Sequence, residues 1–122
     1  MTTPDAALTR TLELEGALAV ALVDYGSGMA LATRTNVPFD LELAAAVNTE
    51  VIRAKLRAIE SLGLDETIED ILITLTGQYH LIRIASRPGL TGVFSYLVLD
   101  RARANLALAR RALKQLEDDI DL

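Results

Sequence analysis

The sole histidine and one serine in a glycine-flanked turn are the residues of this chain whose types suggest catalysis. His80 begins an apolar segment, and no nucleophile or orienting partner accompanies it in the sequence, as a catalytic base would require. Ser27 lies in Gly26-Ser27-Gly28, which lacks the Gly-x-Ser-x-Gly spacing of a nucleophile elbow and favours a turn. We therefore expect no catalytic residue and no enzyme. A hydrolase built on both residues remains a hypothesis, which activity surviving the loss of both would refute.

The sequence also argues against a metal or a cofactor. It contains no cysteine, which excludes disulfides, thiolate metal sites and thiol catalysis. Residues 65–70 form an acidic run without the glycine and ligand spacing of a calcium loop. We interpret this run as a solvated segment whose charge discourages aggregation of the strand that follows. Neither a phosphate-binding loop nor a dinucleotide fingerprint occurs, so we expect no cofactor and no metal site.

Composition narrows the class of partner. The chain has 122 residues, the length of one domain, with 51% hydrophobic but only 4% aromatic residues. Its core must therefore be aliphatic, with little of the aromatic lining typical of small-molecule pockets. Seventeen acidic against twelve basic residues give a net charge of −5, which argues against binding nucleic acid or an anionic membrane. Without a signal-like or membrane-spanning apolar run, we expect a cytoplasmic protein with no membrane insertion.

Apolar periodicity and turn residues predict one α+β domain over residues 1–122, in the order helix, hairpin, long helix, three-stranded meander, helix. Asp40 and Gly63 bracket the long helix, Asp100 is expected to cap the last one, and Gly77-Gln78 suits a tight hairpin turn. The predicted segments are a helix over 1–13 ending by Gly16, strands over 17–24 and 29–33, a helix over 41–62, strands over 67–76, 79–86 and 93–99, a helix over 101–117, and an acidic tail over 118–122 that frays.

The long helix carries more apolar surface than contact with one sheet requires. Two stripes cover over half of its circumference, with Asn48 and Lys55 in the seam between them. A wholly internal core and a face toward a second subunit both remain open. The stripes consist of Ala44, Val47, Val51, Ala54, Ala58 and Leu62, and of Leu41, Ala45, Ile52, Leu56 and Ile59.

Several segments resemble a bacterial member of the Roadblock (dynein light chain) family, and the resemblance spans about residues 14–117. They are Val-Asp-Tyr-Gly-Ser-Gly-Met at 23–29, Ala-Val-Asn-Thr-Glu-Val at 46–51, Glu-Asp-Ile-Leu-Ile-Thr at 69–74 with Tyr-His-Leu-Ile-Arg at 79–83, and Tyr-Leu-Val-Leu-Asp-Arg-Ala-Arg-Ala-Asn-Leu-Ala at 96–107. The resemblance implies a profilin-like, five-stranded antiparallel sheet of order 2-1-5-4-3, with the long helix on one face and the terminal helices on the other.

The same resemblance implies a function. Related domains form homodimers and regulate or scaffold small Ras-like GTPases, so we expect a non-catalytic homodimeric adaptor or regulator of such a GTPase. No arginine carries over as a catalytic finger. The alternatives are a PAS-like domain that senses a small molecule, which the scarcity of aromatics disfavours, and a general scaffold of a signalling complex.

In the order 2-1-5-4-3, the second and third strands are the sheet edges. The second is short and ends among Arg34, Asn36 and Pro38, which blunt an edge. The third contains residues 71–76 without a charge, proline or glycine, and such an edge invites pairing. Antiparallel pairing with its copy across a two-fold axis would also bring the long helices together. The predicted dimer interface comprises Ile71, Leu72, Ile73, Thr74 and Leu75 with Asn48, Val51, Ile52, Lys55 and Ile59.

Overall fold

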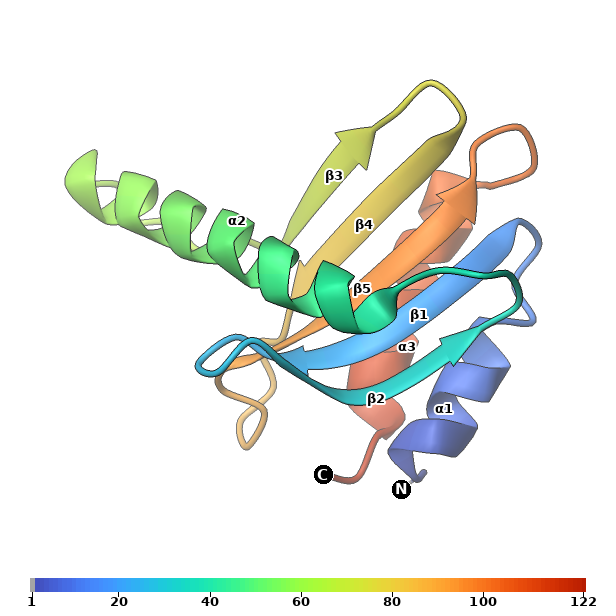
Figure 1. Ribbon diagram of the computed structural model, residues 1–122. Coiled ribbons are helices and arrows are strands. Elements are labelled where there is room, and N and C mark those ends of the chain that lie inside the picture. Colours follow the sequence, from blue (N-terminus) through green and yellow to red (C-terminus); the bar gives the residue numbers. More distant parts are fainter. Residues whose placement is uncertain (1) are drawn as a thin grey trace.

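An antiparallel sheet with a long helix across one face and two helices on the other makes up the chain in the computed structural model, which describes residues 2–122 (Figure 1). The five strands lie in the order β2-β1-β5-β4-β3. This confirms the predicted α+β class, the element order and the sheet topology. The elements are α1 (Pro4–Thr11), β1 (Ala17–Asp24), β2 (Met29–Thr35), α2 (Leu41–Ser61), β3 (Asp70–Thr74), β4 (Gln78–Ile84), β5 (Val93–Asp100) and α3 (Leu106–Asp119).

Small side chains position α2 on its face of the sheet. Ala19 and Ala21 of β1 are buried opposite Ala44 and Ala45 of α2, in one cluster. Because alanine adds only a methyl group, helix and sheet can approach closely at this point. Ile52, further along the same face of α2, is fully buried and continues the contact. None of the helices over residues 2–122 has the length and hydrophobicity needed to cross a bilayer.

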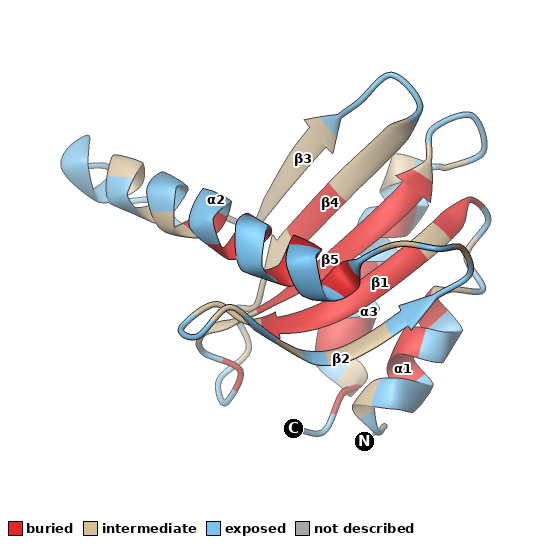
Figure 2. Cartoon of the chain, in the orientation of Figure 1, coloured by how far each residue is buried: buried red, intermediate tan, exposed pale blue. Residues whose placement is uncertain are grey.

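The opposite face is covered by α1 and α3. Leu8 of α1 and Leu113 of α3 pack on Val20 and Leu22 of β1 and Leu97 of β5, and all five are buried. Full burial of such a side chain stabilises the fold by roughly 1.5–3 kcal/mol. Since β1 and β5 have apolar residues on both faces, the prediction that β5 lies inside a covered sheet is confirmed (Figure 2).

Two helix boundaries differ from the prediction. The first helix ends at Thr11 with Leu12 as its C-cap, while Gly16, at φ +85°, turns the chain into β1. The last helix begins five residues later than expected, because Asn105 caps it by accepting a hydrogen bond from the Leu108 backbone N–H. Asp100 instead ends β5, where its carboxylate accepts from the Ala102 N–H in the turn.

The C-terminal tail does not fray as predicted. Helix α3 continues to Asp119, and Ile120 is only 1% exposed. The Arg87 guanidinium donates to the carbonyl oxygens of Glu117, Asp118 and Ile120 at 2.8–3.0 Å, which satisfies carbonyls that a helix end leaves unpaired. Within the tail, Asp118, Asp121 and Leu122 stay exposed.

The two edge strands also differ in length from the prediction. Strand β2 extends to Thr35, and β3 begins only at Asp70, which binds Arg110 of α3 at 3.0 Å. At the next turn the Leu75 N–H donates to the Gln78 carbonyl. Thr76 and Gly77, rather than Gly77 and Gln78, therefore form the centre of the hairpin turn. Strand β4 accordingly starts at Gln78 and ends at Ile84.

Candidate interaction surface

Strand β3 presents an open edge. It pairs with β4 alone, and Ile73 lies opposite His80 in that ladder. Because the Leu75 N–H bonds to Gln78, and bonded pairs alternate in an antiparallel ladder, Leu72 and Thr74 direct their backbone N–H and C=O groups away from β4. These groups are free to pair with another strand.

The side chains of this edge are apolar on both faces. Ile71 and Ile73 are half-buried against the cluster under α2, whereas Leu72 packs toward the α1–α3 face. Thr74 is exposed at the end of the strand, and Leu75 follows it at 42% exposed. The sheet-edge half of the predicted interface therefore lies on accessible surface.

The outward face of α2 carries a second apolar surface. Leu43, Val47 and Val51 are spaced one turn apart and are 59%, 52% and 38% exposed, and we call them the α2 stripe. Figure 2 shows that the outward side of α2 is largely exposed. Sequence reasoning placed Val47 and Val51 in a stripe but missed Leu43. The four-residue spacing from Leu43 to Val47 was the signal that could have found it.

The remaining predicted helix residues point in different directions. Asn48 and Ile52 face the chain's own sheet and are buried, with the Asn48 amide donating to the Ala44 carbonyl at 2.9 Å. They retain almost no surface for a partner. Lys55 is exposed, and Ile59 is half-buried in a groove described below. The structure thus brings only Val51 and Lys55 of the helix set to the outer surface.

Beneath α2, His80 belongs to a hydrogen-bonded chain across β4 and β5. Its Nδ1 lies 2.9 Å from the Tyr96 hydroxyl, and its Nε2 lies 2.9 Å from Gln78 Oε1. Burial raises the pKa of Tyr96 to about 12, against a smaller lowering by the Asn48 side chain, so its hydroxyl stays protonated and can donate to Nδ1. Burial lowers the pKa of His80, which favours the neutral ring.

The structure does not unite the two residues that suggested catalysis. Ser27 donates to Asp24 Oδ2 at 3.1 Å in the β1–β2 turn. Asp24 pairs with the first residue of β5, Val93, while His80 lies opposite Val98 near the other end of that strand. The register therefore separates Ser27 and His80 to opposite ends of the sheet, and the pairing that a hydrolase would need is absent.

Glu117 fastens the β4–β5 loop to α3. Its carboxylate accepts from Arg83 Nε at 3.0 Å, from the Ser86 N–H at 3.2 Å and from the Arg87 N–H at 3.0 Å. Burial alone would raise the pKa of Glu117, but these bonds and the Arg83 charge outweigh it and hold the pKa below its ordinary value. This ion pair belongs to the architecture behind the sheet rather than to either exposed apolar surface.

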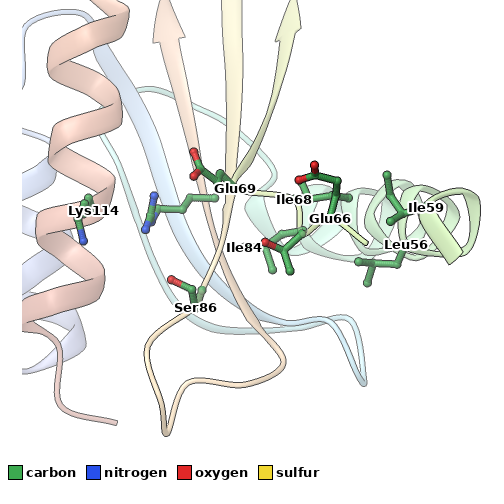
Figure 3. Close-up of a pocket in the computed structure, with 11 residues that line it drawn as sticks. Leu56, Ile59, Glu66, Ile68, Glu69, Ile84, Ser86 and Lys114 are labelled. Atoms are coloured by element: carbon green, nitrogen blue, oxygen red, sulfur yellow. The ribbon is translucent and has the colours of Figure 1, made fainter. Parts of the chain in front are cut away.

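A groove of about 730 Å³ opens beneath the C-terminal half of α2 (Figure 3). Its wall includes Leu56 and Ile59 of α2, Ile84 at the end of β4 and Lys114 of α3, together with the segment over 66–69 that leads into β3. Sequence reasoning did not predict this groove, because it treated residues 65–70 only as a solvated charge run.

Comparisons with known proteins identify structures of the same architecture. No protein-family model and no curated protein matches the chain. Among solved structures it is similar to a Roadblock/LC7 domain from Streptomyces avermitilis, with a TM-score of 0.82 at 12% identity over 96% of this chain and 93% of that one. It is also similar to Myxococcus xanthus MglB, with a TM-score of 0.81 at 18% identity over 94% and 89% of the two chains.

A further similar structure is an MglB with a tetrameric arrangement, which matches with a TM-score of 0.79 at 19% identity over 97% of this chain and 88% of that one. Identities this low speak for the fold alone. The observed strand order and helix placement are those that the resemblance in the sequence implied. The chain therefore has the Roadblock/LC7 fold.

Proposed function

We propose that this protein is a homodimeric, non-catalytic adaptor or regulator of a small Ras-like GTPase. The observation that carries the proposal is the combination of a Roadblock/LC7 fold with two accessible apolar surfaces, the β3 edge and the α2 stripe. Neither surface contains a catalytic constellation, and both have the character of protein-binding sites.

Dimerisation through β3 accounts for the open edge. Antiparallel pairing across a two-fold axis would satisfy the outward N–H and C=O groups of Leu72 and Thr74 in both copies. It would also cover Ile71 and Ile73, whose half-exposed side chains would otherwise remain in water. A tetrameric arrangement of the similar MglB supports self-association as a property of this fold.

The oligomeric state tests this part of the proposal. Light scattering at micromolar concentration should give a mass of twice 13.2 kDa. A well-folded monomer at high concentration would contradict the proposed dimer.

The GTPase partner rests on the resemblance to the Roadblock family. Each small GTPase of the same organism, loaded with GDP or with a GTP analogue, should be tested for capture by the immobilised protein. We expect at least one to be retained, in a stable or nucleotide-dependent complex. The adaptor alone should bind neither GTP nor divalent metals at micromolar concentration in calorimetry. Uniformly empty capture lanes, or tight GTP binding by the adaptor itself, would contradict the proposed role.

A further inference from the structure

The groove beneath α2 has an aliphatic floor contributed by three different elements. Leu56 and Ile59 come from α2, Ile68 from the segment before β3, and Ile84 from the end of β4. All four side chains are only half-buried. Figure 3 shows them gathered on one side of the groove, with Lys114 of α3 on the opposite side. The floor therefore keeps apolar surface that could still be covered.

The charges on its walls do not cancel. Arg83 is bound to Glu117 at 3.0 Å, and Lys114 has Asp118 at 3.6 Å, so each cation of the groove has a carboxylate of its own. Glu66 and Glu69 are exposed, and over residues 2–122 neither forms a salt bridge or a side-chain hydrogen bond. The groove consequently combines an aliphatic floor with two uncompensated negative charges.

We propose that this groove binds a short segment of a partner protein in which aliphatic side chains alternate with lysine or arginine. Aliphatic side chains would cover the half-buried floor, and the flanking cations would pair with Glu66 and Glu69. The volume of about 730 Å³ lies within the range of binding pockets and suffices for a few side chains. Nucleic acids and anionic lipid surfaces carry the wrong charge for these walls. The proposal depends neither on the GTPase nor on the dimer.

The probe is the capped, fluorescently labelled peptide Lys-Leu-Lys-Ile-Lys, titrated with the full-length protein and followed by anisotropy. Two comparison peptides, Lys-Gly-Lys-Gly-Lys and Glu-Leu-Glu-Ile-Glu, remove the aliphatic groups or reverse the charge. We expect each to bind at least about tenfold more weakly, because the groove needs both kinds of contact. If the glycine peptide bound equally well, or if spermidine displaced the first peptide, the binding would be general attraction of cations to an acidic protein. Either result would overturn the proposal.

Matched variants locate the contact. Replacing Glu66 and Glu69 together by Gln should weaken the first peptide by about tenfold. The control replaces Glu15 and Glu42 by Gln and removes the same charge. Both are exposed acids outside the groove, Glu15 just before β1 at the other end of the sheet and Glu42 in the first turn of α2. This control should change affinity by less than about twofold, since a separation beyond a Debye length screens these two charges. An equal loss in the control would refute a site at the groove.

Two further readouts identify where the peptide binds and whether a second copy of the chain competes for the groove. With ¹³C-labelled isoleucine methyl groups, the peptide should shift the signals of Ile59, Ile68 and Ile84, and shifts confined to other isoleucines would overturn the assignment. Light scattering of the Glu66→Gln, Glu69→Gln variant should give the same mass as the wild type. A changed mass would mean that a second copy of the chain occupies the groove. Because dimerisation is measured separately, a failed dimer prediction and a failed groove prediction remain distinguishable.

Discussion

The sheet has two open edges, and they are built differently. Strand β2 pairs with β1 through a register shift between Leu22 and Val23, and it carries the exposed charge of Arg34. Strand β3 pairs with β4 in unbroken register, and its single charged residue, Asp70 at the start, is bound to Arg110. The β2 edge is thus bulged and charged, both features that hinder pairing with another strand, whereas the β3 edge is regular and largely neutral.

Apolar exposure alone does not distinguish the edges. Met29 and Leu31 of β2 are 66% and 48% exposed, whereas the three apolar residues of β3 are only half-exposed. The expectation that β2 is blunt because it is short was wrong, since β2 has seven residues and β3 only five. What separates them is the backbone ladder, which is regular in β3 and shifted in β2. The suitability of an edge for pairing therefore depends on its ladder more than on its hydrophobicity.

A matched pair of proline substitutions, one in each edge strand, tests the difference between the two edges most directly. Thr74 in β3 and Thr33 in β2 both direct their N–H groups outward, as the Leu75–Gln78 and Asn36–Leu18 bonds in the two ladders require. Proline is tolerated at such positions because no internal bond is lost. Thr74→Pro should weaken the dimer on the order of a hundredfold, since a two-fold axis counts each lost bond twice.

Thr33→Pro is the control. It should leave the dimer intact in analytical ultracentrifugation, although its proline should change the melting temperature of the fold about as much as the proline of Thr74→Pro does. If Thr33→Pro dissociated the dimer and Thr74→Pro did not, the roles of the two edges would have to be exchanged.

The edges also show how far sequence reasoning reaches. The bounds of β1, Ala17 and Asp24, and the Asp40 cap of α2 were predicted correctly, because turn and capping residues lie directly beside the apolar runs. The start of α3 was not, because Asp100 and Asn105 are both good caps, and the choice between them depends on pairing of β5 with β4 up to Asp100. Local patterns carry no information about such long-range pairing.

The same limit applies to the tail and the candidate site. Ile120 is held by Arg87, a contact across 33 positions of sequence that no local pattern reveals. The β3 edge was predictable because it rests on the composition of one strand. The groove was not, since Leu56 and Ile84 meet there only through the way α2 crosses the sheet. Asn48 and Ile52 lie inside the broad apolar arc of α2, and only the packing of the helix on the sheet decides which part of that arc is buried.

The Glu117→Gln variant tests whether lower folding stability by itself weakens dimerisation. The variant removes the charge that holds Arg83 and the β4–β5 loop, so the free energy of unfolding should fall by about 1–3 kcal/mol at neutral pH. Because the folded pKa of Glu117 lies below its ordinary value of 4.5, its contribution is present above that pH and is lost as the pH falls through the folded value. In urea titrations, the difference in unfolding free energy between the wild type and the variant should thus be smaller at pH 3 than at pH 7.

Neither edge contains Glu117, so the mass in light scattering should stay that of the dimer. Dissociation of this variant would indicate that weaker folding alone abolishes pairing, and the difference between the edges would lose its support.

Introducing a single charge on α2 tests whether this helix contributes to the proposed dimer interface together with β3. Val47 of the α2 stripe and Leu108 of α3 are 52% and 47% exposed, on opposite faces of the sheet. If the proposed dimer buries the stripe, Val47→Glu should raise the dissociation constant by about tenfold, because a carboxylate would be desolvated against apolar neighbours. Leu108→Glu should have little effect. Equal behaviour of the two variants in sedimentation equilibrium would limit the interface to the strand.

The smallest expected effect is a dependence of folding stability on pH, and it arises from His80, on the strand that pairs with β3. His80 lies on β4 opposite Ile73, and over residues 2–122 no carboxylate oxygen lies within 4.0 Å of its ring nitrogens. The ring accepts from the Tyr96 hydroxyl through Nδ1 and reaches Gln78 through Nε2. A proton on Nδ1 would place two donors face to face unless the hydroxyl turned away. The β2 side has no histidine, because the chain contains only one.

The direction of the effect follows from the lowered pKa. Folded His80 has a pKa below its ordinary value of 6.5, so the unfolded chain binds more protons between the two values, and stability falls as the pH drops below 6.5. The wild type should therefore melt at a lower temperature at pH 5.5 than at pH 7.5. His80→Gln, which keeps a polar group beside Tyr96 but does not titrate, should show a smaller difference. If the melting temperatures of the two proteins changed in parallel across this range, His80 would be excluded as the source of the pH dependence. A weaker pH dependence in the variant would assign it to His80, beside β3.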